Sequence, residues 1–301
     1  MHSQEIQFEQ HDLILPDERV LKIWVTHTAR AAGAPPQPVV VLASGFGRHM
    51  YHNAYLAYYL ALNGFKVYRY DSLDHVGMSH GEIEDFSMGV GLSSLQHAID
   101  FACAEGDLPS VGIVSNSLST RIAIKAASLL PQVRYLVFGV GVVNLRRTLN
   151  KVFDIDIGGP YDEIPQYVFF EKHRIARDAF VPELKEGGWL ELDSTIADLK
   201  RVQQPVVGLV GETDEWVDAG EVERAMSEGV AGPRKLLHLK NASHEIGRNA
   251  RIAREFLKVL TMETMQCAGL DIAGPVNEPL FEEMVQRGIS ERRILRSFVE
   301  E

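Results

Sequence analysis

Ser117 lies in the part of the sequence where residue types and spacing point most clearly to chemistry. The segment VGIVSNSLSTRIAIKAAS (111–128) passes from an apolar run through small residues into a pattern of helical spacing. A serine on such a strand–turn–helix is a nucleophile elbow, and the start of the helix directs backbone N–H groups toward the oxygen of an attacked carbonyl. Serine replaces the flanking glycines of the common motif at positions 115 and 119 and is the next most compact polar residue. The alternative is a serine-rich cap on an ordinary helix.

A serine nucleophile needs a base and a carboxylate that orients the base. When the serine lies on a strand–helix turn, the acid and then the histidine follow it along the chain. Asp214 comes three residues after the apolar run PVVGLVG (205–211), and His244 lies in a small polar loop after RKLLHLK (234–240). We therefore predict that Ser117, Asp214 and His244 act together. Three neighbouring acids compete with Asp214 and are expected to be solvated: Glu212, Glu215 and Asp218.

The expected oxyanion donors are two backbone amides. The sequence SGFG (44–47) comes at the end of the apolar run VVVLAS (39–44), where a second donor is expected beside the elbow. We assign the N–H groups of Phe46 and Leu118 to this role. The stretch lacks the spaced lysine of a phosphate-binding loop, and the remaining alternative is a glycine turn around a core phenylalanine. The loop YDSLDHVGMSHG (70–81) is predicted to brace the site as scaffold.

Apolar runs that predict strands alternate along the chain with segments of helical spacing. The strands are expected at 4–9 and 20–27, as an antiparallel hairpin, and at 39–44, 65–71, 110–115, 135–143, 205–211 and 234–240. The helices are expected at 54–63, 88–102, 118–130, 218–229 and 248–262. This alternation predicts a mostly parallel central sheet with helices on both faces, whose strands end at one edge, where ligand sites form.

Two stretches fall outside this alternation. Residues 145–200 hold aromatic and acidic residues but no clear buried strand, and we expect them to form an inserted cap. Residues 263–301 contain two short amphipathic segments and are expected to form a helical tail on the flank of the sheet. The whole chain, 1–301, is thus predicted to be a single domain.

Composition excludes several classes of protein. Hydrophobic residues make up 46% and charged residues 24% of the 301 residues, as in soluble globular domains, and no apolar run is long enough to cross a membrane. The net charge of −11 argues against nucleic acid as a partner. Cys103 and Cys267 match no metal or redox spacing, so neither a metal nor an organic cofactor is expected. No export signal is visible at the start, which favours a cytoplasmic protein with free thiols.

Several segments, taken together, resemble the α/β-hydrolase superfamily and, within it, the lux-type acyl transferases, which are acyl-carrier-protein thioesterases of bacterial bioluminescence. The likeness extends over nearly the whole chain, and the serine-flanked elbow is its most specific feature. It implies an α/β-hydrolase fold, with the family's charge relay on Ser117, Asp214 and His244. The segments are ASGFGRHM (43–50), YRYDSLDHVGMSHG (68–81), SNSLSTR (115–121), GVVNLR (141–146), LDST (192–195), DEWV (214–217) and ERR (291–293).

The resemblance implies a serine thioesterase or acyl transferase. It would release a medium- or long-chain fatty acyl group from acyl-carrier protein through an acyl-Ser117 intermediate. The product would supply a fatty acid reductase, or enzymes of specialised lipid or polyketide synthesis. The alternative from another class of substrate is a carboxylesterase or lipase-like hydrolase of soluble esters with the same three residues. A non-enzymatic relative that binds acyl ligands has no need of all three groups.

The expected cap contains the candidates for substrate binding. Its aromatic residues are predicted to line an acyl pocket, with plain cap core as the alternative: Tyr161, Tyr167, Phe169 and Phe170. An acidic carrier protein would need a basic patch on this acidic chain. Arg146, Arg147 and Lys151 are the candidates for that patch, unless they form only a solvated face.

Overall fold

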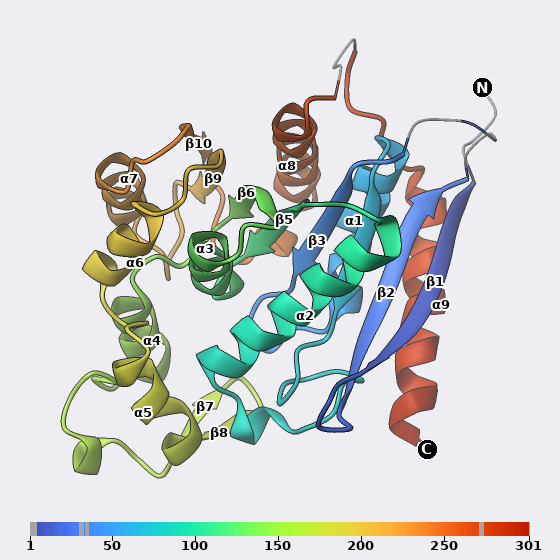
Figure 1. The fold of residues 1–301 in the computed structure, drawn as a ribbon. Helices are drawn as coiled ribbons and strands as arrows, with labels where there is room; N and C mark the ends of the chain where they lie inside the picture. Colours follow the sequence, from blue (N-terminus) through green and yellow to red (C-terminus); the bar gives the residue numbers. More distant parts are fainter. Residues whose placement is uncertain (1–4, 30–32, 34–35, 271–273, 301) are drawn as a thin grey trace.

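A sheet of eight strands forms the centre of the computed structural model, which describes residues 5–29, 33, 36–270 and 274–300 (Figure 1). The strand order is β1-β2-β4-β3-β5-β6-β9-β10. The pairs β1–β2 and β2–β4 are antiparallel and all other neighbours are parallel, so the predicted mostly parallel sheet is confirmed. The strands are β1 (Ile6–Ile14), β2 (Val20–Thr28), β3 (Val39–Ala43), β4 (Lys66–Tyr70), β5 (Val111–Asn116), β6 (Val133–Gly139), β9 (Val206–Gly211) and β10 (Arg234–Leu239).

Helices cover both faces of this sheet, because its parallel strands are apolar on both sides. In β3, Val39 and Val41 belong to one buried cluster and Val40 and Leu42 to the other, as the alternation of side chains along a strand requires. Residues of α2 (Met88–Gly106), α3 (Ser119–Leu129) and α7 (Ala219–Glu228) join the first cluster. Residues of α1 (Ala54–Leu62) and α8 (Ala250–Ala268) join the second.

The sixth strand ends earlier than its apolar sequence predicts. The run 135–143 was expected to be one strand, whereas β6 spans Val133–Gly139. At Val140 the backbone enters the left-handed region, with φ 44°. The Val142 N–H then donates to the carbonyl of Ser117 at 3.0 Å. The apolar residues after β6 therefore support the elbow instead of extending the sheet.

Residues between β6 and β9 contribute no strand to the eight-stranded sheet. They form α4 (Leu145–Phe153), a short antiparallel hairpin of β7 (Tyr167–Phe170) and β8 (His173–Ala176), α5 (Arg177–Glu186) and α6 (Leu192–Leu199). The hairpin corrects the expectation that this stretch lacks a strand. A buried ion pair of 2.7 Å between Arg121 and Asp198 joins α3 to α6. That the segment 145–200 acts as a cap stays a prediction.

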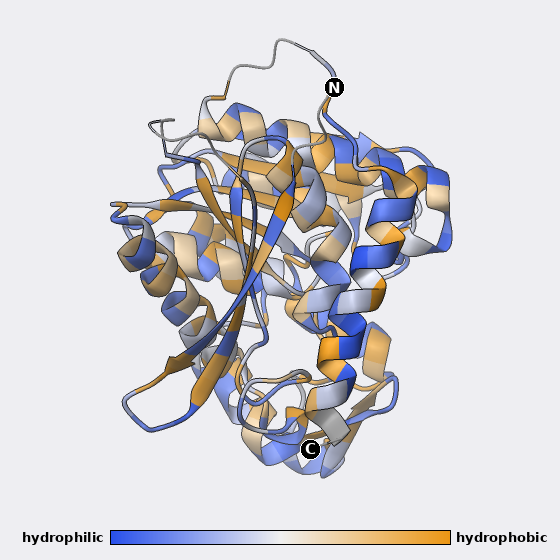
Figure 2. Cartoon of the chain, turned by 90° about the vertical axis from the view of Figure 1, so that its right-hand side faces the viewer, coloured by the Kyte–Doolittle hydropathy of each residue, from blue (hydrophilic) through white to orange (hydrophobic). Residues whose placement is uncertain are grey.

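The C-terminal part differs from the two short segments expected there. Residues 263–268 complete α8, and α9 (Phe281–Glu300) is one long helix. It runs along the β1–β2 side of the sheet, where it faces the viewer in Figure 2 and mixes hydrophobic with hydrophilic residues. Ile294 and Leu295 pack against a buried cluster of Trp24 (β2), Met50 and Met78. Residue 4 of the expected hairpin and residues 271–273 and 301 of the expected tail lie outside the described residues.

The helices in the described part of the chain are each too short or too polar to span a lipid bilayer.

Candidate active site

Ser117 stands on a sharp turn between β5 and α3, in the left-handed region of backbone conformation with φ 56°. Such a conformation costs a non-glycine residue on the order of 1–3 kcal/mol and persists only where its surroundings hold it. Three backbone hydrogen bonds do so. The Ser117 carbonyl accepts from Val142 at 3.0 Å and from Thr120 at 3.1 Å, and its N–H donates to Gly139 at 3.3 Å. The predicted elbow geometry is therefore present.

The serines that replace the flanking glycines make specific hydrogen bonds. The Ser115 hydroxyl lies 3.2 Å from that of Thr120, within α3. The Ser119 hydroxyl accepts the Asn116 N–H at 3.2 Å and lies 3.0 Å from the Ala43 carbonyl of β3. Both side chains are buried, so their hydroxyls tie the strand and the helix together around Ser117.

The structure brings Ser117, His244 and Asp214 into one line of hydrogen bonds. His244 Nε2 lies 2.8 Å from Ser117 Oγ. On the other side of the ring, Nδ1 lies 2.9 Å from Asp214 Oδ2 and 3.1 Å from Oδ1. The side chains of Asp214 and His244 are 2% and 5% exposed. This geometry lets the imidazole take a proton from the hydroxyl while the carboxylate stabilises the resulting positive charge.

The turn after β9 positions Asp214 for this role. Its Oδ1 accepts the N–H groups of Trp216 at 2.8 Å and Val217 at 2.9 Å, so the carboxylate orientation is fixed by backbone. The Trp216 ring lies against the His244 ring, with centroids 4.5 Å apart. The sequence does not predict this contact of Trp216, because a tryptophan beside an acid carries no signal that separates stacking from core packing.

The neighbouring acids occupy other positions. Glu212 is exposed. Asp218 caps α7 by accepting the Glu221 N–H at 3.2 Å. Glu215 is closer to the site than expected, because its Oε2 accepts the backbone N–H of His244 at 3.2 Å. Of these acids, only Asp214 reaches the imidazole ring in the described structure.

The assigned oxyanion donors lie on either side of the serine. Leu118 is the residue between Ser117 and α3, and Phe46 follows β3. In the described part of the chain neither of these two N–H groups donates to a protein acceptor, which leaves both available to a ligand. A side chain on Gly45 would come within 3.4 Å of Ser117 Cβ, so the loop and the elbow approach each other closely.

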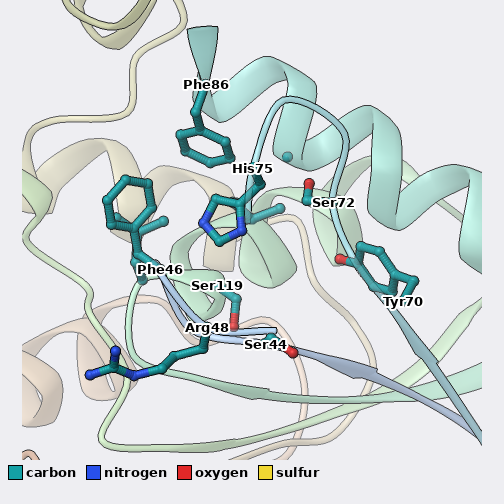
Figure 3. Close-up of a pocket in the computed structure, with 11 residues that line it drawn as sticks. Ser44, Phe46, Arg48, Tyr70, Ser72, His75, Phe86 and Ser119 are labelled. Carbon is teal, nitrogen blue, oxygen red and sulfur yellow. The ribbon is translucent and has the colours of Figure 1, made fainter. Parts of the chain in front are cut away.

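A buried histidine braces the Phe46 loop. His75 Nε2 accepts the Gly47 N–H at 3.1 Å. Its ring packs against Phe46 and Phe86, with centroids 5.2 and 5.1 Å away (Figure 3). Burial lowers the pKa of His75 to about 3, so the ring is neutral and keeps a free lone pair for Gly47. The sequence carries no signal for this contact, because a single histidine in a loop does not reveal which backbone group it holds.

Asp71 anchors the loop that the sequence predicted as scaffold. Its carboxylate accepts the Met50 N–H at 2.6 Å and the Met78 N–H at 2.9 Å. Burial raises its pKa to about 6, although these two hydrogen bonds favour the charged form. A Cβ on Gly77, where φ is 136°, would lie 2.2 Å from the Asp71 carboxyl carbon, so glycine is required there.

An open pocket of about 500 Å³ contains Ser117 and His244. This volume falls within the roughly 300–1,000 Å³ common for small-molecule sites. The pocket is lined by residues from the elbow, the Phe46 loop, the hairpin and the loop after β10: Gly45, Phe46, Arg48, His52, Asn53, Asn116, Ser117, Val140, Phe170, Trp216, His244, Glu245, Ile246, Gly247, Arg248 and Phe256.

Of the four aromatic residues expected to line an acyl pocket, Phe170 alone lines the pocket that contains Ser117. In β7 the side chains alternate, which buries Phe170 and leaves Phe169 61% exposed. Tyr167 lies under the Arg174 guanidinium, 4.5 Å from ring centroid to Cζ. Tyr161 is exposed and donates to Asp178. Tyr161, Tyr167 and Phe169 thus lie outside the pocket that contains Ser117, and their role in substrate binding stays a prediction.

The expected basic patch is largely neutralised by partners within the chain. Arg146 pairs with Asp156 at 2.7 Å and with Glu191 at 3.1 Å. Arg147 pairs with Asp218 at 2.8 Å and with Glu221 at 3.3 Å. Two of its three members thus offer little net positive charge to a carrier protein. Lys151 is exposed.

Known proteins are similar to this chain in sequence and in fold. The chain is 36% identical over 287 residues to the acyl transferase of Photobacterium phosphoreum, covering 94% of this chain and 93% of that one. It is 37% identical over 258 residues to the acyl transferase of Vibrio harveyi, covering 85% of this chain and 84% of that one. Among solved structures, Est1E from Butyrivibrio proteoclasticus superimposes with a TM-score of 0.68 at 12% identity, covering 86% of this chain and 99% of that one.

The structural match supports the fold, and the sequence matches support the family. At 12% identity the match to Est1E concerns the fold alone, and together with the strand order it identifies an α/β-hydrolase fold. The profile of a family described as acyl transferase matches residues 8–300, nearly the whole chain. The chain therefore belongs to the acyl transferase family, whose members are enzymes that act on acyl groups.

Proposed function

We propose that this protein is a serine thioesterase or acyl transferase that releases a medium- or long-chain fatty acyl group from acyl-carrier protein through an acyl-Ser117 intermediate. The observation that carries the proposal is the hydrogen-bonded line of Ser117, His244 and Asp214 opening into the pocket of about 500 Å³. Membership of the acyl transferase family supports an acyl group as the part transferred.

Acylation begins when Ser117 Oγ attacks the thioester carbonyl and His244 Nε2 takes the hydroxyl proton. Asp214 stabilises the imidazolium through Nδ1. The carbonyl oxygen becomes an oxyanion that accepts the N–H groups of Phe46 and Leu118, and one such donor contributes about 3 kcal/mol to lowering the barrier. The C–S bond then breaks, the thiolate takes the proton from His244, and the acyl group stays on Ser117 as an ester.

Deacylation reverses the roles of the same groups. Water or an alcohol gives its proton to His244 as its oxygen attacks the ester carbonyl. The C–O bond to Ser117 breaks, and Ser117 Oγ recovers the proton from His244. With water the product is a free fatty acid, and with an alcohol it is a new ester. The open pocket admits either acceptor, so the acceptor decides between hydrolysis and transfer.

The carrier protein and the downstream enzyme belong to the same proposal. The acyl transferases of Photobacterium phosphoreum and Vibrio harveyi are the relatives that support it. The released acid would pass to a fatty acid reductase, or to biosynthetic enzymes that use a free acid. Such a pathway fits a cytoplasmic enzyme.

Pre-steady-state mixing tests the intermediate. The enzyme is mixed with acyl-carrier protein, carrier thiol is followed over milliseconds to seconds, and the quenched protein is digested for mass spectrometry. We expect a burst of about one thiol per enzyme and an acyl adduct on the peptide that contains Ser117. Ser117→Ala should show neither, and Ser128→Ala, which changes a serine in the following helix α3 and outside the pocket, should show both.

The competing function is a carboxylesterase of soluble esters. It predicts turnover of short nitrophenyl esters at a rate that exceeds turnover of acyl-carrier thioesters at equal concentration. That result, or an adduct on Ser115 or Ser119, would contradict the proposal. If added glycerol leaves the steady-state rate unchanged, the result would support hydrolysis of the acyl-enzyme and contradict transfer of the acyl group to alcohols.

A further inference from the structure

A second pocket, of about 290 Å³, adjoins the one that contains Ser117. It lies between α9 on one side and, on the other, α1 with the 3₁₀ helix η1 (Met50–Asn53) that precedes it. His52 lines both pockets, so the two are neighbours. The remaining lining residues combine aromatic, small and aliphatic side chains with one arginine: Tyr51, Ala54, Tyr55, Val285, Gly288, Ile289 and Arg292.

Arg292 is the charged side chain in the lining of this second pocket. Within the described residues it forms no ion pair, whereas Arg48 at the neighbouring site pairs with Glu171 at 2.6 Å. Burial lowers the pKa of His52, with smaller contributions from the charges of Arg48 and Arg292, so this ring adds no charge near neutral pH. Among the described residues, the pocket therefore presents one guanidinium without an ion-pair partner, in a chain whose net charge is −11.

The two walls of the second pocket are held together by buried groups. Met50, at the start of η1, donates its N–H to Asp71 at 2.6 Å, and its carbonyl accepts from Arg69 at 3.4 Å. The fully buried Arg69 in turn makes a bidentate ion pair with Glu291 of α9, at 2.8 and 2.9 Å. Arg292 directly follows Glu291, so this ion pair fixes the backbone of Arg292 relative to η1, while its side chain is exposed.

Apart from Arg292, the residues that line this pocket are uncharged near neutral pH, so a ligand that extends from Arg292 into the first pocket should be an anion with an uncharged arm. A guanidinium binds phosphate oxygens more strongly than it binds neutral acceptors, because its donors match two of them at once. Tyr51 and Tyr55 offer hydroxyl groups and flat ring surfaces to amides along the arm. The acyl end has to reach Ser117, past His52.

We propose that the second pocket binds the phosphate end of the phosphopantetheine arm that bears the acyl thioester, with Arg292 paired to the phosphate. The inference rests on the proposed thioesterase function and adds a binding site for the arm. The same arm is present in acyl-carrier protein and in coenzyme A, and it is the shared phosphopantetheine that the pocket recognises.

Small thioesters that differ only in the phosphate test the site. For one acyl chain, kcat/KM is measured with acyl-pantetheine, acyl-phosphopantetheine, acyl-coenzyme A and acyl-carrier protein. We expect the wild type to prefer acyl-phosphopantetheine over acyl-pantetheine. Arg292→Gln should lower kcat/KM about tenfold for the three phosphate-bearing substrates and leave acyl-pantetheine unchanged, because glutamine keeps a hydrogen-bond donor but loses the charge that pairs with phosphate. Arg293→Gln is the matched control, since Arg293 is exposed on α9 outside the pocket.

The possible failures are distinguishable. Equal rates on the first two substrates, or equal losses on both in Arg292→Gln, would overturn the inference alone. A loss confined to acyl-carrier protein would also overturn it, by assigning Arg292 to the protein surface of the carrier. If the enzyme cleaves none of the thioesters yet still hydrolyses esters through Ser117, the proposed function fails, and this inference fails with it.

Discussion

Replacing Asp214 by asparagine tests whether this carboxylate controls the protonation of His244. In the wild type, Oδ1 accepts the N–H groups of Trp216 and Val217, and both oxygens face His244 Nδ1. In Asp214→Asn the single amide oxygen is held by those two backbone donors. The NH₂ group therefore faces Nδ1, which must then accept a hydrogen bond.

An imidazole that accepts at Nδ1 carries its proton on Nε2, 2.8 Å from Ser117 Oγ. A protonated Nε2 cannot take the hydroxyl proton, so acylation fails although every group keeps its position. The loss expected from the wrong tautomer is about 10⁴-fold in kcat, or about 5 kcal/mol of barrier. The thermal midpoint should change little, because the Trp216 and Val217 N–H groups keep an acceptor.

The assay is the rate of Ser117 labelling by a fluorophosphonate, together with kcat on an acyl thioester and the thermal midpoint. The matched control is Glu215→Gln, which keeps an oxygen for the His244 backbone N–H and should cost less than about threefold in kcat. Glu212→Gln, at an exposed position, should cost nothing measurable. The tautomer argument would be refuted if Asp214→Asn kept a tenth of the activity, or if either glutamate variant were as damaging.

Three further predictions concern groups around the site. Burial in the folded protein lowers the pKa of His75 to about 3. Below pH ~6.5 this side chain therefore gains a proton in the unfolded chain but not in the folded protein. His75 should thus contribute a fall in the unfolding free energy of roughly 1.4 kcal/mol per pH unit from pH ~6.5 toward 3, and His75→Gln should reduce the measured slope by about that amount in denaturant titrations. Phe170→Leu should raise KM for long acyl chains several-fold, whereas Phe169→Leu on the exposed face of β7 should not; equal effects in steady-state kinetics would exclude Phe170 from the acyl site. Gly77→Ala should lower the thermal midpoint by many degrees, because its Cβ would collide with Asp71, and an unchanged midpoint would contradict the tight packing of this loop.

The pattern of apolar runs was sufficient to predict the central sheet, because strands buried on both faces must be apolar at consecutive positions. β3 and β9 follow their predicted ranges closely. The same rule misplaced the end of β6, since Val140, Val142 and Val143 are as apolar as the strand before them and are buried around the elbow instead. Hydrophobicity indicates that a segment is buried, but it does not distinguish a buried strand from a buried loop.

The hairpin of β7 and β8 escaped prediction for a related reason. Its strands are four residues each and only one of their faces is buried, so they leave a weak periodic signal. Once the hairpin was missed, the alternation that turns Phe169 outward and Phe170 inward could not be known. Four aromatic residues were therefore treated alike, although the structure brings only one of them to the pocket.

The sequence by itself determined the alternation of strands and helices, the small-residue turn at Ser117 and the order of serine, acid and histidine on loops after strands. These features are local, and a parallel sheet brings the ends of its strands together whatever the side chains are. Their catalytic role stays a prediction. Only the tertiary structure decided which of several neighbouring acids faces His244, which histidine braces the Phe46 loop, and which arginines are free. Each of these depends on contacts between residues far apart in the chain: Asp214 with His244, Gly47 with His75, Arg69 with Glu291. Such contacts follow from how the loops and α9 pack, and no residue spacing encodes them.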